Sequence, residues 1–102
     1  MPTALFVVKA TIAKDREAAF NRWYNAEHCP QVLRYPGAVS ARRYRAIFGE
    51  DTYQYMAVYE FQDEDTLRRF VESPHMKELK REYDAHFEDS SRQRFGYVQV
   101  WP

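Results

Sequence analysis

The chain has 102 residues, which is the size of one domain, so residues 1–102 are expected to form a single unit. Its fifteen Lys and Arg balance fifteen Asp and Glu, and this zero net charge argues against a nucleic-acid-binding protein. The single cysteine, Cys29, excludes an internal disulfide, and the apolar run at residues 4–8 is too short for a signal peptide or membrane span, so we expect a soluble, cytoplasmic protein without a membrane partner.

The first part of the chain predicts a strand followed by a helix. Residues 5–12 alternate in hydrophobicity, with Phe6 and Val8 on the same face of the strand. Asp15 is a plausible N-cap for a helix that continues to residue 28. Pro30 disfavours helical geometry at the residue before it, so the helix is expected to end at about Cys29.

The middle of the chain predicts a hairpin. Residues 39–48 and 53–61 have strand character, and residues 49–52 form the loop between them. The second of these strands alternates clearly, with Tyr55, Tyr59 and Phe61 on one face.

Two helices and a last strand complete the chain. Asp63 is expected to cap a short helix, and Ser73 with Pro74 to begin a longer one. The residues predicted to be buried on these helices are Leu67, Phe70, Val71, Met76, Leu79, Tyr83 and Phe87. Residues 95–101 are expected to form the final strand, with Phe95, Tyr97 and Trp101 on one face.

The order βαββαβ predicts an α+β, ferredoxin-like fold, in which both helices cover one face of an antiparallel sheet. The first and last strands are then expected side by side in the middle of the sheet. Aromatic residues are 17% of the chain and include eight tyrosines. The alternation in the predicted strands places some of these rings on the face without helices. We therefore expect either a homodimer packed through that face or a lined pocket, while a tyrosine-rich core edge is the simpler alternative.

One face of the first predicted helix changes from apolar to ionisable residues near the end of the helix. Phe20, Trp23 and Tyr24 have the spacing of core residues, whereas Glu27 and His28 continue the same face. At a helix C-terminus the dipole favours imidazolium, so we expect His28 to be charged and at the rim of the sheet. The alternative is a structural histidine that bonds the last carbonyls of the helix.

Three segments resemble the EthD-like branch of the dimeric α+β barrel superfamily: residues 23–30 (WYNAEHCP), residues 35–37 (YPG) and residues 41–44 (ARRY). The resemblance implies a homodimer whose sheets face each other, with a pocket in each subunit. Relatives include methylmuconolactone methyl-isomerase, polyketide cyclases and haem- or quinol-linked monooxygenases, several of which need no metal or organic cofactor. The resemblance places a pocket histidine at His28 and a strand tyrosine at Tyr44, with His75 near a further histidine of cyclase-like members.

The residue types are consistent with acid/base chemistry. His28 can move a proton at neutral pH, and Tyr44 can stabilise a developing oxyanion. Arg43 is a possible carboxylate anchor, although strand arginines more often pair with acids at interfaces. The predicted pocket walls are Trp23, Tyr24, Tyr55, Tyr59 and Trp101, with His75 as a further candidate. Cys29 is not expected to be a nucleophile, and His86 is expected at the surface.

The leading hypothesis is a cofactor-independent isomerase, cyclase or lyase that acts on a small aromatic, lactone or polyketide-like molecule. One alternative is a non-catalytic dimeric protein that binds a small ligand or assists a degradation pathway. Another is a quinol- or haem-linked monooxygenase. Zinc-site spacing, a glycine-rich phosphate loop and a Gly-x-Ser-x-Gly elbow are absent from the sequence, so we expect no metal and no cofactor.

Overall fold

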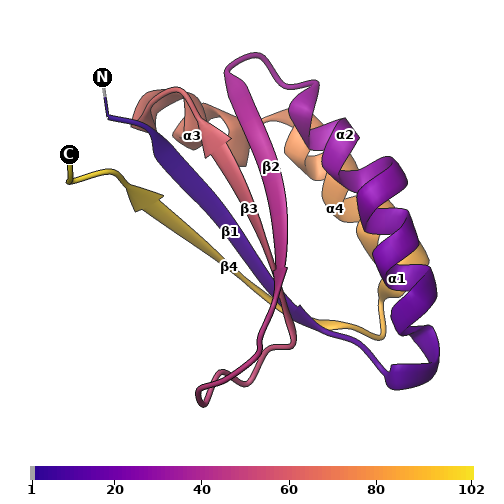
Figure 1. Cartoon of the computed structure of the whole chain (residues 1–102). Helices are drawn as coiled ribbons and strands as arrows, with labels where there is room; N and C mark the ends of the chain where they lie inside the picture. The colour runs from indigo at the N-terminus through magenta and orange to yellow at the C-terminus, as the bar shows by residue number, and fades with distance from the viewer. Residues whose placement is uncertain (1) are drawn as a thin grey trace.

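The computed structural model describes residues 2–102 and confirms the α+β, ferredoxin-like arrangement (Figure 1). Its strands are β1 (Ala4–Thr11), β2 (Ala38–Arg45), β3 (Tyr55–Phe61) and β4 (Ser91–Val98). Its helices are α1 (Glu17–Trp23), α2 (Cys29–Leu33), α3 (Glu64–Val71) and α4 (Pro74–Phe87), with a 3-10 turn η1 (Lys14–Arg16) and a π-helical turn η2 (Tyr24–His28). None of the helices within residues 2–102 has the length and apolar composition that crossing a membrane requires.

The sheet has the order β2-β3-β1-β4, and all neighbouring strands are antiparallel. β1 and β4 are neighbours as predicted, but the prediction that both lie in the middle of the sheet is wrong. The β2–β3 hairpin places β3 against one side of β1, which leaves only the other side for β4. β4 is therefore an edge strand, and its side chains lie close to the rim of the helix layer.

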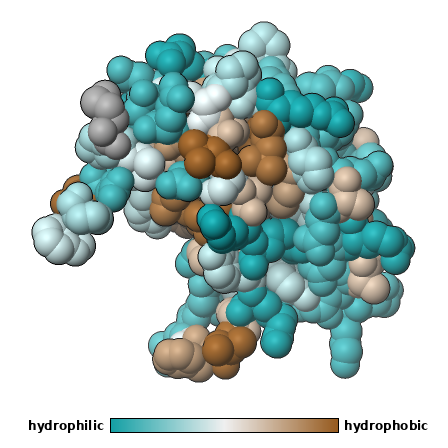
Figure 2. Space-filling model, turned by 45° about the horizontal axis from the view of Figure 1, so that its top comes forward, coloured by the Kyte–Doolittle hydropathy of each residue, from teal (hydrophilic) through white to brown (hydrophobic). Residues whose placement is uncertain are grey.

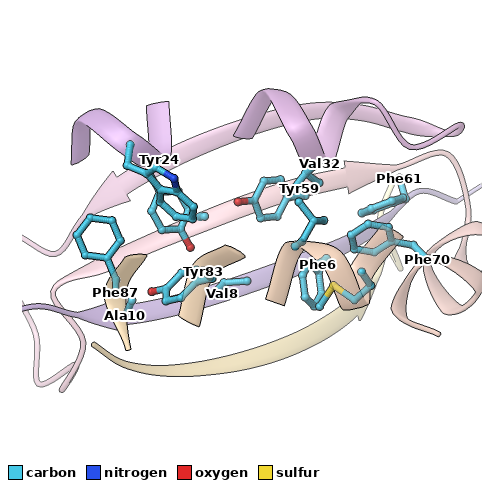
Figure 3. Packing of buried hydrophobic residues seen from close by; sticks show 14 of the residues in the cluster. Phe6, Val8, Ala10, Tyr24, Val32, Tyr59, Phe61, Phe70, Tyr83 and Phe87 are labelled. Carbon is cyan, nitrogen blue, oxygen red and sulfur yellow. The ribbon is translucent and has the colours of Figure 1, made fainter. Parts of the chain in front are cut away.

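The helices cover one face of this sheet, as Figure 1 shows. On β1 and β3 that face carries buried side chains: Phe6, Val8, Ala10, Ala57, Tyr59 and Phe61. These pack against the inner side of the helices (Figure 3). The period of two in a strand explains why the predicted faces of β1 and β3 are confirmed.

The first helical segment differs from its prediction at both ends. Asp15 lies inside η1, and the N-cap of α1 is Arg16, whose side chain makes no capping bond. The chain also remains helical beyond Pro30, as far as Leu33. In η2 the Cys29 N–H bonds to the Tyr24 carbonyl, and this wider turn places Pro30 in the first turn of α2, where the missing N–H of proline is tolerated.

The other helix starts are confirmed. The Asp63 carboxylate accepts a bond from the Thr66 N–H at 2.8 Å, and the Ser73 hydroxyl accepts one from the Met76 N–H at 3.1 Å. The predicted buried residues of α3 and α4 are buried, except Val71, which lines a surface groove beside β4 at the end of its short helix.

The ends of β2, β3 and β4 differ from the predicted ends of these strands. β2 and β3 are shorter than predicted, and the loop between them carries the exposed Ile47 and Phe48. Figure 2 shows a projection with hydrophobic atoms at the bottom of the molecule, where Figure 1 places this loop. β4 begins at Ser91 rather than Phe95 and ends at Val98. Because β1 begins only at Ala4, the residues after Gln99 have no strand to pair with.

Candidate functional site

The π-helical turn places His28 inside the molecule. Its side chain is only 6% exposed and stacks on Trp23, with ring centroids 4.6 Å apart. The rings of Tyr24 and Tyr83 meet its other sides edge-on, at 4.9 and 5.7 Å. The imidazole is therefore surrounded by aromatic rings from η2 and α4.

The prediction of a charged His28 at the rim of the sheet is wrong. The helix does not end at Cys29, so no carbonyl end of a helix dipole stabilises an imidazolium there. Burial, followed by the charges of Arg92, Arg43 and Arg94, lowers the pKa of His28 to about 4. The imidazole is neutral at pH 7, and its Nδ1 is buried without a hydrogen-bond partner in residues 2–102.

A small cavity, which we call the His28 cavity, lies between this imidazole, the helix-covered sheet face and α4. Its lining is formed by Phe6, Val8, Tyr24, His28, Val32, Tyr59, Phe70, Met76, Leu79, Lys80, Tyr83, Arg92 and Arg94. The volume is about 20 Å³, which is room for one water molecule. The pocket expected beside His28 is therefore small in a single chain, and a ligand larger than water requires lining side chains to move.

Tyr24 and Tyr83 both line this cavity, and Figure 3 shows the Tyr83 ring beside Val8 with Tyr24 next to it. Their ring centroids are 5.9 Å apart. Burial raises the pKa of both phenols, so both are neutral hydroxyl groups at pH 7. They can donate a hydrogen bond to an oxygen that gains negative charge, but they cannot act as bases there.

Cationic side chains form the β4 side of the cavity. The Arg92 guanidinium lies 3.9 Å from the centre of the Tyr83 ring and 2.9 Å from a carboxylate oxygen of Asp84. Arg94 is half-buried two residues further along the same strand face, and Lys80 is exposed on α4. Burial and the neighbouring Arg92 charge lower the pKa of the Arg94 guanidinium.

The structure does not bring Tyr44 to His28. Tyr44 pairs with Met56 on the face of the sheet that the helices leave uncovered, and its side chain is 49% exposed. Because successive residues of a strand point to opposite faces, the pairing of Tyr44 with His28 in one site is wrong for this chain.

Arg43 and Tyr55 lie on the correct face, but toward α1 and outside the lining of the His28 cavity. The Arg43 guanidinium donates to the Asn25 side chain at 3.0 Å and lies 4.4 Å from the centre of the Tyr24 ring. The Tyr55 hydroxyl bonds to Glu17 and accepts from Asn21. These contacts hold η2 and α1 on the sheet, although the buried Nε of Arg43 has no hydrogen-bond partner within residues 2–102.

The remaining predicted residues are divided between the site and the scaffold. Tyr24 and Tyr59 line the cavity, whereas Trp23 stacks on the His28 ring and is not part of the lining. His75 contacts the Gln31 carbonyl through Nε2 at 2.8 Å and so joins α4 to α2. Trp101 is 85% exposed beyond the end of β4, so its prediction as a pocket wall is wrong.

The prediction that His86 lies at the surface is confirmed, and the surroundings of Cys29 are consistent with the expectation that it is not a nucleophile. The Cys29 thiol contacts the Tyr59 hydroxyl, and burial raises its pKa, which disfavours the nucleophilic thiolate. His86 is exposed and stacks on the outer side of Trp23 at 5.2 Å.

Sequence reasoning missed Lys80, Tyr83, Arg92 and Arg94 as site residues. The predicted last strand began at Phe95, so both arginines fell in a loop. A strand from Ser91 would have placed Arg92 and Arg94 on one face, opposite Phe95. Lys80 and Tyr83 are one helical turn apart on α4, and the helical spacing of Tyr83 predicts a core residue only.

No group of three or more His, Cys, Asp or Glu side chains in residues 2–102 is arranged to hold a metal ion. The groups available for chemistry around the cavity are one neutral imidazole, phenol hydroxyls and cations. Such a set can accept a proton and stabilise the resulting anion.

Solved structures share this fold across nearly the whole chain. An EthD family protein from Bacillus halodurans superposes with a TM-score of 0.75 at 16% identity, covering 98% of this chain and 100% of that one. A dabb family protein with a ferredoxin-like fold from Mesorhizobium loti gives 0.73 at 13% identity, covering 99% and 100%. SnoaB, a cofactor-independent oxygenase from Streptomyces nogalater, gives 0.65 at 19% identity, covering 98% and 95%.

At these identities the similarity establishes the fold alone, and it confirms the predicted ferredoxin-like fold, which this chain shares with the EthD family protein. No curated protein matches the chain in sequence. One family model covers residues 3–94, which span β1 to the middle of β4 and include the whole lining of the His28 cavity. The chain therefore belongs to the family described as a domain of unknown function, DUF4286.

Proposed function

We propose that this chain is an acid/base enzyme that needs no metal or organic cofactor and acts on a small, largely apolar molecule, with His28 as the proton acceptor. The observation that carries the proposal is the buried, neutral imidazole whose Nδ1 lacks a partner beside a cavity lined by cations. A buried polar atom without a partner costs about 1–3 kcal/mol, so a ligand group that bonds to this nitrogen can recover part of that cost.

The reaction begins when a proton leaves an acidic C–H or O–H of the substrate for a nitrogen of His28. The electron pair of the broken bond moves onto the substrate oxygen, which becomes an enolate or phenolate. Arg92 and the neutral Tyr83 hydroxyl lie on the cavity wall and stabilise that charge, in place of the distant Tyr44. Return of the proton to another atom gives isomerisation, and expulsion of a leaving group gives elimination.

The low pKa of His28 affects this step in two ways. It keeps the imidazole free of a proton at pH 7, but it also makes the imidazole a weak base. A substrate that brings negative charge raises the pKa of His28, because it offsets the arginine charges that lower it.

The experiment is proton exchange in D2O, followed by NMR for a set of aromatic lactones, phenols and 1,3-diketones. The wild-type chain should catalyse exchange at the acidic position of at least one of them. His28→Ala should slow that exchange by roughly 10²–10⁴-fold while the circular dichroism spectrum is unchanged. His86→Ala removes an exposed imidazole and is the matched control, which should keep the wild-type rate. Equal rates in wild-type and His28→Ala protein would rule out the proposed role.

A second candidate function is cofactor-independent oxygenation, which the structural similarity to SnoaB supports. Oxygenation of a phenolate or enolate starts with the same proton removal, after which dioxygen is the oxidant. Oxygen consumption with exchange-active compounds distinguishes the two functions, since isomerisation, cyclisation and elimination consume none.

We also propose that two copies pack through the uncovered sheet face. That face carries Leu5, Val7, Met56, Val58, Phe95 and Tyr97, a set too apolar for a fully solvated surface. Phe95→Glu should convert a dimer into a monomer in analytical ultracentrifugation, whereas Arg22→Glu on exposed α1 should not. A wild-type chain that is monomeric at 100 μM would contradict this assembly.

A further inference from the structure

Arg94 differs from the other half-buried arginines of the chain in having no partner. Arg16 pairs with Asp89, Arg43 bonds to Asn25, and Arg92 pairs with Asp84. Arg94 makes neither an ion pair nor a side-chain hydrogen bond within residues 2–102, although it faces the helix layer and lines the His28 cavity. A partly desolvated guanidinium without an anion is unfavourable, and a ligand can relieve that cost.

The charges around Arg94 are also unbalanced. Lys80, Arg92 and Arg94 line the same cavity, and among the described residues 2–102 the one carboxylate paired with any of them is Asp84. The side chain of Asp84 is 60% exposed, so solvent weakens its effect on the interior. The excess positive charge therefore faces the cavity, where the dielectric constant is low and the interaction with an anion is strong.

We propose that Arg94, with Arg92 and Lys80, binds a carboxylate group of the substrate, so that the natural ligand is a small carboxylic acid with an apolar body. The planar guanidinium matches the two oxygens of a carboxylate. The cavity has room for one water molecule only, so lining side chains must move to admit the acid, whose apolar body would then contact Phe6, Val8 and Leu79. This inference rests on the proposed function for the role of His28, and it adds the class of substrate.

Such a carboxylate also activates the base. Arg92 and Arg94 contribute to the low pKa of His28, together with Arg43 on the other side of η2. The charges that lower the pKa of His28 within residues 2–102 are those of arginines, so the negative charge of a bound carboxylate would oppose them. The imidazole becomes a stronger base only when the acid is bound, which limits proton removal from other molecules.

The binding test compares acids with amides of the same shape: acetate with acetamide, and benzoate with benzamide. Trp23 stacks on His28, and in a Trp101→Phe background it is the one tryptophan, so its fluorescence reports ligand at the cavity. We expect an acid to bind at least tenfold more tightly than its amide. Arg94→Gln should abolish that preference, Arg94→Lys should retain part of it, and Arg42→Gln on the uncovered sheet face should leave it unchanged.

A second readout separates binding from a purely structural effect of Arg94. In NMR titrations the pKa of His28 should rise when the protein is saturated with benzoate or acetate, but not with the amides. This rise should be lost in Arg94→Gln. Failure of both acids to bind, equal binding of acid and amide, or a preference that survives in Arg94→Gln would overturn the proposal.

The two proposals fail in different ways. Acid-selective binding that raises the pKa of His28, without exchange in any compound, would leave the carboxylate site and remove the enzymatic function. Exchange that depends on His28 but is equally fast for acids and neutral compounds, without acid-selective binding, would leave the enzyme and remove the carboxylate site.

Discussion

The two faces of the sheet are built from alternate residues of the same strands, yet they have different roles. On β3, Ala57, Tyr59 and Phe61 are buried under the helices, while Met56 and Val58 between them are only half-buried. The helix-covered face holds His28 among rings and cations, and the uncovered face holds Tyr44, Phe95 and Tyr97. Thus one residue of displacement along a strand decides between the covered and the uncovered face, and so between a place near His28 and a place away from it.

The largest expected effect is the loss of stability of the chain when a buried ring of the covered face is removed. Phe61→Ala removes a ring with no exposed surface and should lower the free energy of unfolding by about 3–5 kcal/mol. Val58→Ala, on the other face of the same strand, should lower it by about 1 kcal/mol or less at micromolar protein concentration. Urea unfolding measures both values, and similar losses for the two variants would contradict the difference between the faces.

The next effect concerns pH and the buried imidazole. His28 has a pKa of about 4 in the folded chain and near 6.5 when unfolded, so between these values the unfolded chain binds more protons. Stability is therefore complete above about pH 6.5 and falls as the pH decreases toward 4. From pH 7 to pH 5 the loss should be about 2 kcal/mol.

Urea unfolding at the two pH values measures this loss in wild-type and His28→Gln protein. The variant should lose most of the pH dependence, because glutamine does not titrate. His86→Gln is the control, since His86 is exposed and its replacement should leave the dependence in place. A wild-type chain equally stable at pH 5 and pH 7 would show that His28 is not held neutral by burial.

The smallest expected effect is a change in the pKa of His28 when one arginine charge is removed. Arg92 is the largest charge contribution that lowers the pKa of His28, so Arg92→Gln should raise this pKa without ligand. Arg42→Gln removes a guanidinium from the uncovered face and should leave it unchanged. Histidine NMR titrations measure both, and equal shifts would mean that the sheet does not separate the two faces electrostatically.

Much of the fold was predictable because its signals are local. The alternation of β3 set its covered face, and Asp63 and Ser73 began their helices where the capping pattern placed them. The continuation past Pro30 was not predictable from propensity, since it depends on a π-helical turn that shifts the hydrogen bonding before the proline. The end of β4 was mispredicted because Trp101 fits a strand pattern, but β1 offers it no partner.

The candidate site was less accessible to sequence reasoning. His28 could be identified because its helical face changes from apolar to ionisable residues. Its protonation state could not, since burial and three arginines of β2 and β4 determine its pKa. Tyr44 and Arg94 illustrate the same difficulty in opposite directions. Both are polar strand residues, and only the register of β2 and β4 against their neighbours decides which of them faces the helices.

Periodicity, capping residues and the order of elements thus account for the ferredoxin-like architecture and for His28 as a residue of interest, because these depend on neighbours within a few positions of the chain. The neutrality of His28, the cations beside it and the separation of Tyr44 from it arose only in three dimensions. Desolvation and charge interactions depend on distances between segments far apart in sequence, and the packing of α4 and β4 against η2 sets those distances.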